Sequence, residues 1–495
     1  MGVPARKSRM FEPTESLTRG QRAVEAFRFD EARLAYSKAL EHAPESIDAL
    51  RGLGYSLLQL GRLSASLEAL ERALHIDPTD LLCRLLMGRL CLRLQQPAGA
   101  EEHFRGILQR IPASEAARSG LIDALVAQED LAGAKVQSES VLKDNPDSEV
   151  GHLAAARLAG FERDDAKALD HFSKLVRLRP GHPVHLYNRG LCLLRLGRFE
   201  PGWRDFEYRF AAGAVHAKLP DSPRWDGRPV DRLLLVAEQG LGDTILFSRF
   251  IADAASRGCT PVLVCPDALV GLLGRSLGCE CVADSAASWP RHDAHLPLMS
   301  LPFVLGLGAA AAAQRSAYLA ADPERYARWS AAIEAGPDGQ RRIGIVHETS
   351  VAHSTEQNSC TRRSCRAADL EALTQMDGVV AYNLNVGPAA ERAHRDLPKL
   401  RDLPAPLADF DDTAAVLQLM DAVICVDTAI AHVAGALGTP AGLLLPFVRD
   451  WRWVPQEGRL PWYWRVHATA QQIPGRWNEP VRQQQAALSA TIALR

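Results

Sequence analysis

The residues best placed to do chemistry lie near the C-terminus, in the stretch VDTAIAH from Val426 to His432. The apolar run before this stretch has the composition of a buried parallel strand, and Ala429–Leu437 carries apolar residues at helical spacing. Asp427 and Thr428 lie between them, where small polar side chains cap a helix, and His432 follows Thr428 by about one helical turn. A strand that leads into a helix N-terminus can hold phosphate with free backbone N–H groups. An ordinary buried βαβ unit with a capping Asp and a core His has the same pattern.

A second stretch, EQGLGDT, follows another predicted buried strand, Leu233–Ala237. A Rossmann fingerprint needs a further glycine at position 245, which is Ile245, and no Walker lysine follows. A dehydrogenase or a P-loop NTPase is therefore not expected. Asp243 is predicted either to cap the next helix or to act as a general base that faces a cleft. The loop around it consists of Gln239, Gly240, Leu241, Gly242 and Thr244.

A third polar stretch, HETSVAHSTEQNSCTRRSC, comes after the predicted strand Arg342–Val346. Its basic side chains are candidates for contacts with an anionic ligand, namely His347, His353, Arg362 and Arg363. A metal site is the other interpretation, with ligands from His347, His353, Cys360 and Cys365. No spacing there matches a standard zinc signature, so no metal is expected. A surface loop without a ligand is the remaining alternative.

The N-terminal part of the chain repeats itself every 34 residues. Prolines recur at this interval, at Pro44, Pro78, Pro112, Pro146 and Pro180. The position ten residues after the proline is small in four of five repeats, and the position eight before it is mostly bulky. This is the tetratricopeptide (TPR) pattern, in which small residues lie where paired helices touch. It predicts a solenoid over 14–210 with about six repeats, the last of which docks onto the next domain. Its groove is expected to bind a protein or peptide, and a spacer or an oligomerisation scaffold is the alternative.

Length and composition indicate an ordinary globular protein with several domains. The 495 residues are 47% apolar and 23% charged with a net charge of −2, and no apolar run is long enough to span a bilayer. These values favour neither nucleic-acid nor membrane binding, and ten scattered cysteines without a secretory signal predict a cytoplasmic location. We expect a disordered N-terminus over 1–13, a linker or ordered strap over 211–230, and α/β domains over 231–335 and 341–495.

Several strings resemble bacterial TPR proteins with a C-terminal glycosyltransferase domain: PRWDG, AEQGLGDTILFSRF, HLPLMSLP, DFDDTAAVLQLMDAVICVDTAIAHVAGALGTPAGLLLP and DWRW. That domain is similar to the ADP-heptose heptosyltransferases of glycosyltransferase family 9 and, more remotely, to the protein O-GlcNAc transferases. The resemblance implies a GT-B fold, in which two Rossmann-like domains face each other across a cleft, with no cofactor and no obligatory metal. It makes Asp243 the base for the acceptor. It places the nucleotide-sugar donor at Asp427, Thr428, Ala429 and His432, near His347, Arg363 and Ser364.

One departure from the family pattern lies in the third stretch. Where family members usually have a Trp-Ala-Gly type turn followed by Asn-Pro, this chain has His347, Glu348, Thr349 and Ser350. We expect an α + α/β protein that works as a metal-independent inverting glycosyltransferase on a polypeptide or on another partner-delivered acceptor. The alternative is a non-catalytic TPR adaptor whose GT-B domain has become a binding module.

Overall fold

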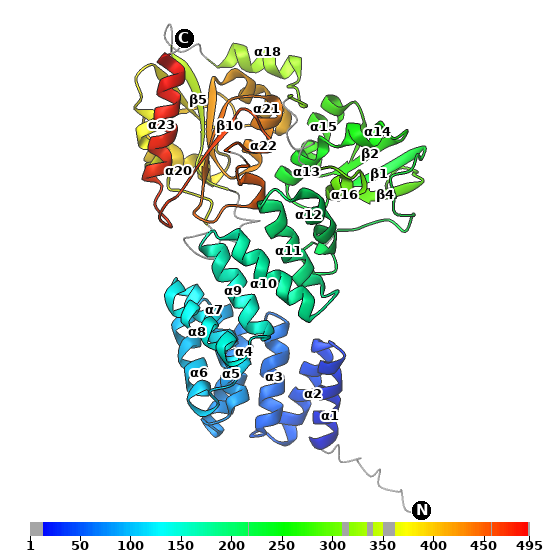
Figure 1. Cartoon of the computed structure of the whole chain (residues 1–495), viewed down its shortest axis with the longest axis vertical. Coiled ribbons are helices and arrows are strands. Elements are labelled where there is room, and N and C mark those ends of the chain that lie inside the picture. The colour runs from blue at the N-terminus through cyan, green and yellow to red at the C-terminus, as the bar shows by residue number, and fades with distance from the viewer. Residues whose placement is uncertain are drawn as a thin grey trace, which may run out of the picture. The chain divides into compact units, whose positions relative to one another are not determined.

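The computed structural model describes residues 13–215, 217–308, 316–333, 340–349, 362–456 and 458–493. The chain forms two compact units, Met1–Leu158 and Ala159–Arg495. The first is helical, and the second combines helices with two parallel sheets (Figure 1). The predicted α + α/β architecture is confirmed. Residues 350–361 of the third polar stretch lie outside the described residues, and with them Ser350, His353 and Cys360. Most of the segment predicted to be disordered, 1–13, also lies outside them.

The first unit consists of antiparallel helix pairs in the tetratricopeptide arrangement. Helices of 13 and 14 residues alternate along it. The prolines of the repeat lie in the turns between pairs. The helices are α1 (Pro13–Glu25), α2 (Phe29–His42), α3 (Ile47–Gln59), α4 (Leu63–Ile76), α5 (Leu81–Arg93), α6 (Pro97–Arg110), α7 (Glu115–Ala127) and α8 (Leu131–Asp144), followed by α9 (Glu149–Phe161) at the boundary of the two units.

Small residues are needed where these helices touch. A Cβ added at Gly54 would lie 2.7 Å from the Leu70 side chain, and one at Gly88 would lie 2.7 Å from the Phe104 ring. These pairs join the small and the bulky positions of the repeat, which confirms the predicted helix contact. A polar N-cap also recurs at the repeat interval. Ser46, Asp80 and Ser114 each accept a hydrogen bond from the backbone N–H of the residue three positions later.

The last helices of the repeat region belong to the second unit. These are α10 (Asp165–Leu178), α11 (Pro183–Arg195) and α12 (Phe199–Phe206). The unit boundary therefore lies inside the segment predicted as one solenoid. The reason is a buried aromatic cluster in which Trp203 of α12 contacts three rings of the α/β part, with centroids 5.8 Å away at Phe247, 5.5 Å at Trp451 and 6.3 Å at Trp462.

The first α/β domain has a four-stranded parallel sheet in the order β3-β2-β1-β4. Its strands are β1 (Arg232–Val236), β2 (Thr260–Cys265), β3 (Glu280–Ala283) and β4 (Ala294–Pro297). One face packs on α13 (Leu241–Ser248), α14 (Ile251–Ala255) and α15 (Val270–Leu277), with α16 (Leu301–Val304) following β4. The predicted linker is ordered at Trp225, which is buried and donates its backbone N–H to the His295 carbonyl at 2.8 Å.

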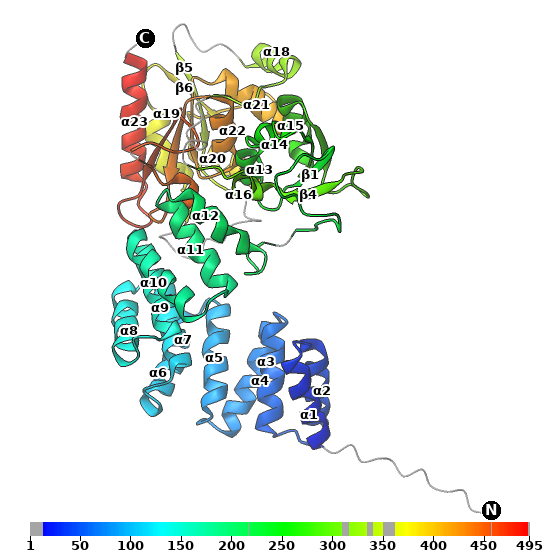
Figure 2. The ribbon, with the colours of Figure 1, turned by 45° about the vertical axis from the view of Figure 1, so that its right-hand side comes forward.

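The second α/β domain has a six-stranded parallel sheet in the order β10-β9-β8-β5-β6-β7. Its strands are β5 (Arg341–Val346), β6 (Val379–Asn383), β7 (Arg401–Asp402), β8 (Ala422–Val426), β9 (Ala441–Leu445) and β10 (Val466–Ala470). One face packs on α19 (Glu371–Thr374), α20 (Pro388–Asp396) and α23 (Asn478–Ala493), and the other packs on α21 (Phe410–Leu419) and α22 (Ala429–Leu437) (Figure 2). Helix α18 (Pro323–Ala332) packs on α21.

Both sheets follow the strand order of Rossmann-like domains. In each, the order reverses beside the first strand, between β1 and β4 in one domain and between β5 and β8 in the other. Ligands of open parallel sheets bind outside the carboxyl ends of the strands at this reversal. The loops after β1, β5 and β8 are therefore the places to look for a site, and they carry the three polar stretches.

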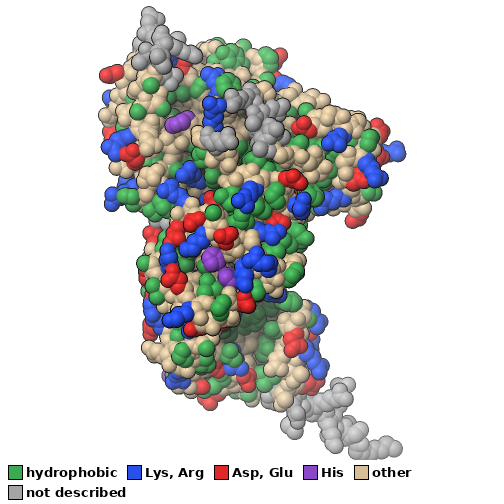
Figure 3. Space-filling model, in the orientation of Figure 1, with side chains coloured by type: hydrophobic (Ala, Val, Ile, Leu, Met, Phe, Trp, Pro, Cys, Tyr) green, Lys and Arg blue, Asp and Glu red, His purple; other side chains and the backbone are tan. Residues whose placement is uncertain are grey.

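The surface of the described residues carries both signs of charge. On the face drawn in Figure 3, basic and acidic side chains are interspersed over both units, in agreement with the small net charge. Among the described helices, none combines the length and the apolar character that a membrane span requires.

The aromatic cluster gives a test of how the last repeat is joined to the α/β domains. Because Trp203 is 3% exposed, Trp203→Ala should lower the free energy of unfolding of the second unit by about 3–5 kcal/mol. Trp464, which is 53% exposed, provides the control, since Trp464→Ala should change it by no more than about 0.5 kcal/mol. Urea unfolding of the full chain measures both variants. Equal effects of the two substitutions would contradict this packing.

Candidate functional site

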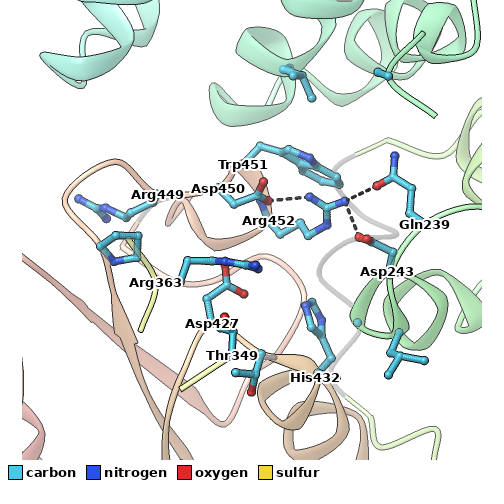
Figure 4. Close-up of a pocket in the computed structure, with 18 of the residues that line it drawn as sticks. Gln239, Asp243, Thr349, Arg363, Asp427, His432, Arg449, Asp450, Trp451 and Arg452 are labelled. Atoms are coloured by element: carbon cyan, nitrogen blue, oxygen red, sulfur yellow. Dashed lines mark hydrogen bonds and ion pairs between the residues drawn. The ribbon is translucent and has the colours of Figure 1, made fainter. Parts of the chain in front are cut away.

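A pocket of about 970 Å3 lies at the carboxyl ends of strands from both sheets. Its walls come from α11, from the start of α13, and from the start of α22 together with the loop that follows β9. The pocket brings together Asp243, Arg363, Asp427, His432 and Arg452 (Figure 4). Residues far apart in the sequence thus share one cavity. All of it lies within the second unit.

The glycine-rich loop supplies the wall on the side of the first α/β domain. Helix α13 begins at Leu241, and its N-cap is Gly240, which offers no side chain. Asp243 stands in the first helical turn and not at the N-cap position, yet its carboxylate accepts a hydrogen bond from the Gly240 backbone N–H, so the capping alternative holds in part. Gly242 permits the two domains to approach, because a Cβ there would lie 2.6 Å from Cδ2 of His432.

The Asp243 carboxylate is paired with the guanidinium of Arg452. Nη1 of Arg452 also donates to Oδ1 of Asp450 at 2.8 Å, and Nη2 donates to Oε1 of Gln239 at 3.2 Å (Figure 4). The guanidinium carbon lies 4.5 Å from the centre of the Trp451 ring. The Arg452 side chain is only 12% exposed, and although burial acts to lower its pKa, the carboxylates of Asp243 and Asp450 raise it. A buried, fixed positive charge therefore stands in the pocket wall.

The two carboxylates on this arginine differ. Burial raises the pKa of Asp243 above its ordinary value, and the pairing with Arg452 only partly offsets this. Burial also acts to raise the pKa of Asp450, but there Arg452 prevails and holds it below its ordinary value. Asp450 is therefore the permanent anion, and Asp243 is the carboxylate that accepts a proton more readily.

The turn between β8 and α22 supplies the opposite wall. Thr428 is the N-cap of α22, and its Oγ1 accepts a hydrogen bond from the Ile430 N–H at 3.2 Å. Asp427 does not cap the helix, contrary to the prediction that both residues do. Its Oδ1 accepts a hydrogen bond from Nε1 of Trp453 at 2.7 Å, and burial, with Asp450 nearby, raises the pKa of Asp427 to about 6.

His432 lines the pocket and is also buried. Its Nδ1 lies 3.0 Å from the Tyr463 hydroxyl, and its ring centre lies 4.6 Å from that of Trp453. Burial lowers the pKa of His432 to about 3, so the imidazole is neutral near pH 7. His432 can therefore offer a hydrogen bond to a ligand but not a positive charge. Among the described residues, the cations that line the pocket are arginines, namely Arg195, Arg363, Arg449 and Arg452.

The third polar stretch reaches the pocket through Thr349 and Arg363. The backbone N–H of Thr349 donates to Oγ of Ser364 at 3.1 Å. His347 is buried behind the wall, with Nδ1 2.8 Å from Oδ1 of Asn385, and burial lowers its pKa. Of the predicted site residues that the structure describes, His347, Arg362, Ser364 and Thr244 do not line the pocket, whereas Gln239, Gly240, Leu241, Gly242, Asp243, Arg363, Asp427, Thr428, Ala429 and His432 do.

Sequence reasoning assigned no role to five charged residues that line the pocket, namely Arg195, Asp284, Arg449, Asp450 and Arg452. Asp450 and Arg452 belong to the string DWRW, which contributed to the family resemblance only as a pattern. An arginine between two tryptophans just after a predicted strand was the available signal. Arg449 precedes that string, and Arg195 comes from the last repeat helix, where nothing local distinguishes it from other surface arginines.

Comparisons with known proteins agree with this architecture. Residues 17–80 and 92–158 match tetratricopeptide-repeat families, and residues 384–442 match glycosyltransferase family 9 (heptosyltransferase). The chain is 27% identical over 492 residues to Protein FlbA of Caulobacter vibrioides, covering 91% of this chain and 75% of FlbA. The chain therefore combines segments that match tetratricopeptide repeats with a segment that matches glycosyltransferase family 9.

The family 9 segment contains the β8–α22 turn with Asp427, Thr428 and His432. The loop of Asp243 and the DWRW string lie outside it. The segment therefore covers one wall of the pocket, and the Asp243–Arg452 pair is a feature of the rest of the chain.

Solved tetratricopeptide-repeat structures are similar to part of the chain. A repeat protein from Parabacteroides merdae is 17% identical over 40% of this chain and 79% of its own, with a TM-score of 0.35. PilW, a type IV pilus biogenesis factor, is 18% identical over 41% of this chain and 92% of its own, with a TM-score of 0.36. YrrB, described as a TPR protein with an unusual peptide-binding site, is 19% identical over 36% of this chain and 93% of its own, with a TM-score of 0.30.

The pKa of Asp427 predicts a pH-dependent stability. A carboxyl whose pKa is about 6 in the folded protein, against 3.8 ordinarily, binds its proton more tightly when folded. This tighter binding of the proton thus adds to the free energy of unfolding below about pH 4, and the addition is lost as the pH rises through 6. The free energy of unfolding changes by at most about 3 kcal/mol.

Asp427→Asn keeps the acceptor for Trp453 and removes the titration. The free energy of unfolding of this variant minus that of the parent should rise between about pH 4 and pH 6 and then level off. Urea unfolding across this pH range measures the difference. A difference that does not vary with pH would show that Asp427 has an ordinary pKa.

Proposed function

We propose that the second unit is a metal-independent inverting glycosyltransferase, which moves a sugar from a nucleotide-sugar donor to a polypeptide or another partner-delivered acceptor. The observation that carries the proposal is one pocket in which the Asp243 carboxylate of one Rossmann-like domain faces a helix N-terminus and arginines of the other. Its volume of about 970 Å3 is at the upper end of the usual range for small-molecule pockets, which suits a nucleotide sugar. The family 9 match supports the same reaction class.

The donor's diphosphate would lie at the start of α22. Sugar transfer breaks the bond between the anomeric carbon and the diphosphate oxygen, and negative charge grows on that oxygen. The Ala429 backbone N–H at the positive end of α22 and the guanidinium groups of Arg363 and Arg452 line the pocket and could stabilise this charge. These groups make a metal ion unnecessary in the proposed reaction. His432, as a neutral imidazole, would contribute a hydrogen bond.

Asp243 would be the general base. It would take the proton from the acceptor hydroxyl while that oxygen attacks the anomeric carbon from the face opposite the leaving diphosphate, so that the configuration inverts. The raised pKa of Asp243 suits this task, because a base whose pKa lies closer to the working pH transfers protons more effectively. The residues of α11 that line the pocket connect the helical repeats to this acceptor side.

The donor half of the proposal is tested with a panel of nucleotide sugars and nucleoside diphosphates. A true donor at a hundred- to thousandfold excess over its Kd should stabilise the fold by roughly 3–4 kcal/mol, which a thermal-shift assay detects easily. The shift should persist in EDTA. Loss of the shift in EDTA would contradict metal independence, and no shift with any compound would favour the alternative of a TPR adaptor with a non-catalytic GT-B domain.

The acceptor half is tested by removing repeats. Deleting the first three repeats, α1 to α6, should leave the donor-induced thermal shift unchanged, because the pocket lies within the second unit. Transfer of a labelled sugar to protein acceptors in a cell extract should fall roughly tenfold or more, since a lost interface of modest size costs at least 1.4 kcal/mol. Unchanged transfer would show that the groove does not recruit the acceptor.

A further inference from the structure

We propose that Arg452 is a positioning residue that exchanges its ion pair with Asp243 for one with the donor's diphosphate, so that donor binding releases the base. This inference rests on the proposed function. It concerns a step that the pocket performs before the sugar is transferred.

Arg452 is held on one side by its own loop. Asp450 caps the short helix at Trp451–Trp453 by accepting the Arg452 backbone N–H at 3.0 Å, and it also accepts Nη1 at 2.8 Å. The guanidinium lies over the Trp451 ring. These contacts come from the second α/β domain and keep the arginine in the pocket wall whatever happens on its other side.

The other side of Arg452 faces the first α/β domain. There Nη2 meets the Asp243 carboxylate and Oε1 of Gln239. Nε of Arg452 is buried and has no hydrogen-bond partner among the described residues. A buried donor without a partner is costly, and a guanidinium can serve two anions at once through its fork. Nε itself is enclosed, but the three contacts of Nη1 and Nη2 leave part of the fork's donor capacity for an additional anionic ligand.

The charges around Arg452 identify the partner that must leave. Three carboxylates surround it, from α13 (Asp243), from the loop after β9 (Asp450) and from the end of β8 (Asp427). The other charged residues of the pocket are Asp284 and the arginines Arg195, Arg363 and Arg449, while His432 is neutral. A diphosphate entering this cluster is repelled by the carboxylates. Asp450 lies on the same loop as Arg452 and is fixed by its backbone cap, and Asp427 is bonded to Trp453. Asp243 also accepts a hydrogen bond from the Gly240 backbone N–H, but its ion pair with Arg452 joins the two domains, so this pair is the one that the diphosphate replaces.

The exchange places a usable base in the pocket only when a donor is present. While Asp243 is paired with Arg452, the pairing works against its taking up a proton. Once the diphosphate takes Arg452, Asp243 regains its basicity. It then receives the proton of the acceptor hydroxyl as the new carbon–oxygen bond forms. The diphosphate leaves with the electron pair of the broken bond and is neutralised by Arg452.

A double-mutant cycle on nucleoside diphosphate binding tests the exchange without the sugar or the acceptor. The affinities of ADP, CDP, GDP and UDP are measured by calorimetry for the parent, Asp243→Asn, Arg452→Met and the double variant. Asp243→Asn should bind the preferred nucleotide about three- to tenfold more tightly, because the competitor for Arg452 is gone. Arg452→Met should bind it at least about tenfold more weakly, the range for a hydrogen bond to a charged group. The double variant should match Arg452→Met.

Asp284→Asn is the matched control. Asp284 also lines the pocket, but it is not among the carboxylates around Arg452, so its removal reports the general effect of one negative charge. An equal gain in affinity from Asp284→Asn, or a gain from Asp243→Asn that persists without Arg452, would overturn the exchange. If Arg452→Met does not fold, Arg452→Lys replaces it, since an ammonium keeps the charge and loses the fork. A parent that binds none of the nucleotides would instead contradict the proposed function itself.

Discussion

A buried guanidinium between carboxylates of two domains is the interaction on which the site depends. A charge that is removed from water must be paired and hydrogen-bonded, because an isolated buried ion is too costly to keep. Arg452 meets this requirement with Asp450 on its own loop and with Asp243 and Gln239 on the facing domain. The same contact joins the two Rossmann-like domains and determines where the Asp243 carboxylate lies in the pocket.

The loop that carries Arg452 is positioned by packing. Trp451 stands within 5.5 Å of Trp203 and 6.2 Å of Phe206, measured between ring centres, and both of these belong to the last repeat helix, α12. The end of the helical repeat is thus built into the core of the α/β part, which accounts for a unit boundary at Leu158 rather than at the end of the repeats. Through this packing, the repeat region contributes both a pocket wall and the support for the arginine.

Local patterns in the sequence were enough to predict the helices and strands, but they did not predict the contacts between residues far apart in the sequence. The 34-residue spacing of the prolines predicts helix pairs because each repeat needs the same turn and the same small contact residue. The stretch around Asp427 and Thr428 predicts a strand followed by a helix. Which of the two residues caps the helix depends on Trp453, which donates a hydrogen bond to the Asp427 carboxylate. The charge of His432 likewise depends on burial by residues distant in sequence, and the pairing of Asp243 with Arg452 has no local signal.

The central claim is that the pocket holds a nucleotide diphosphate between the start of α22 and Arg452. A crystal structure of the protein with its preferred nucleoside diphosphate tests this most directly. The account predicts phosphate oxygens within hydrogen-bond distance of the Ala429 backbone N–H at the start of α22 and of the Arg452 guanidinium, with the Asp243 carboxylate released from that arginine. A nucleotide bound away from α22, or bound there with the Asp243–Arg452 pair intact, would contradict it.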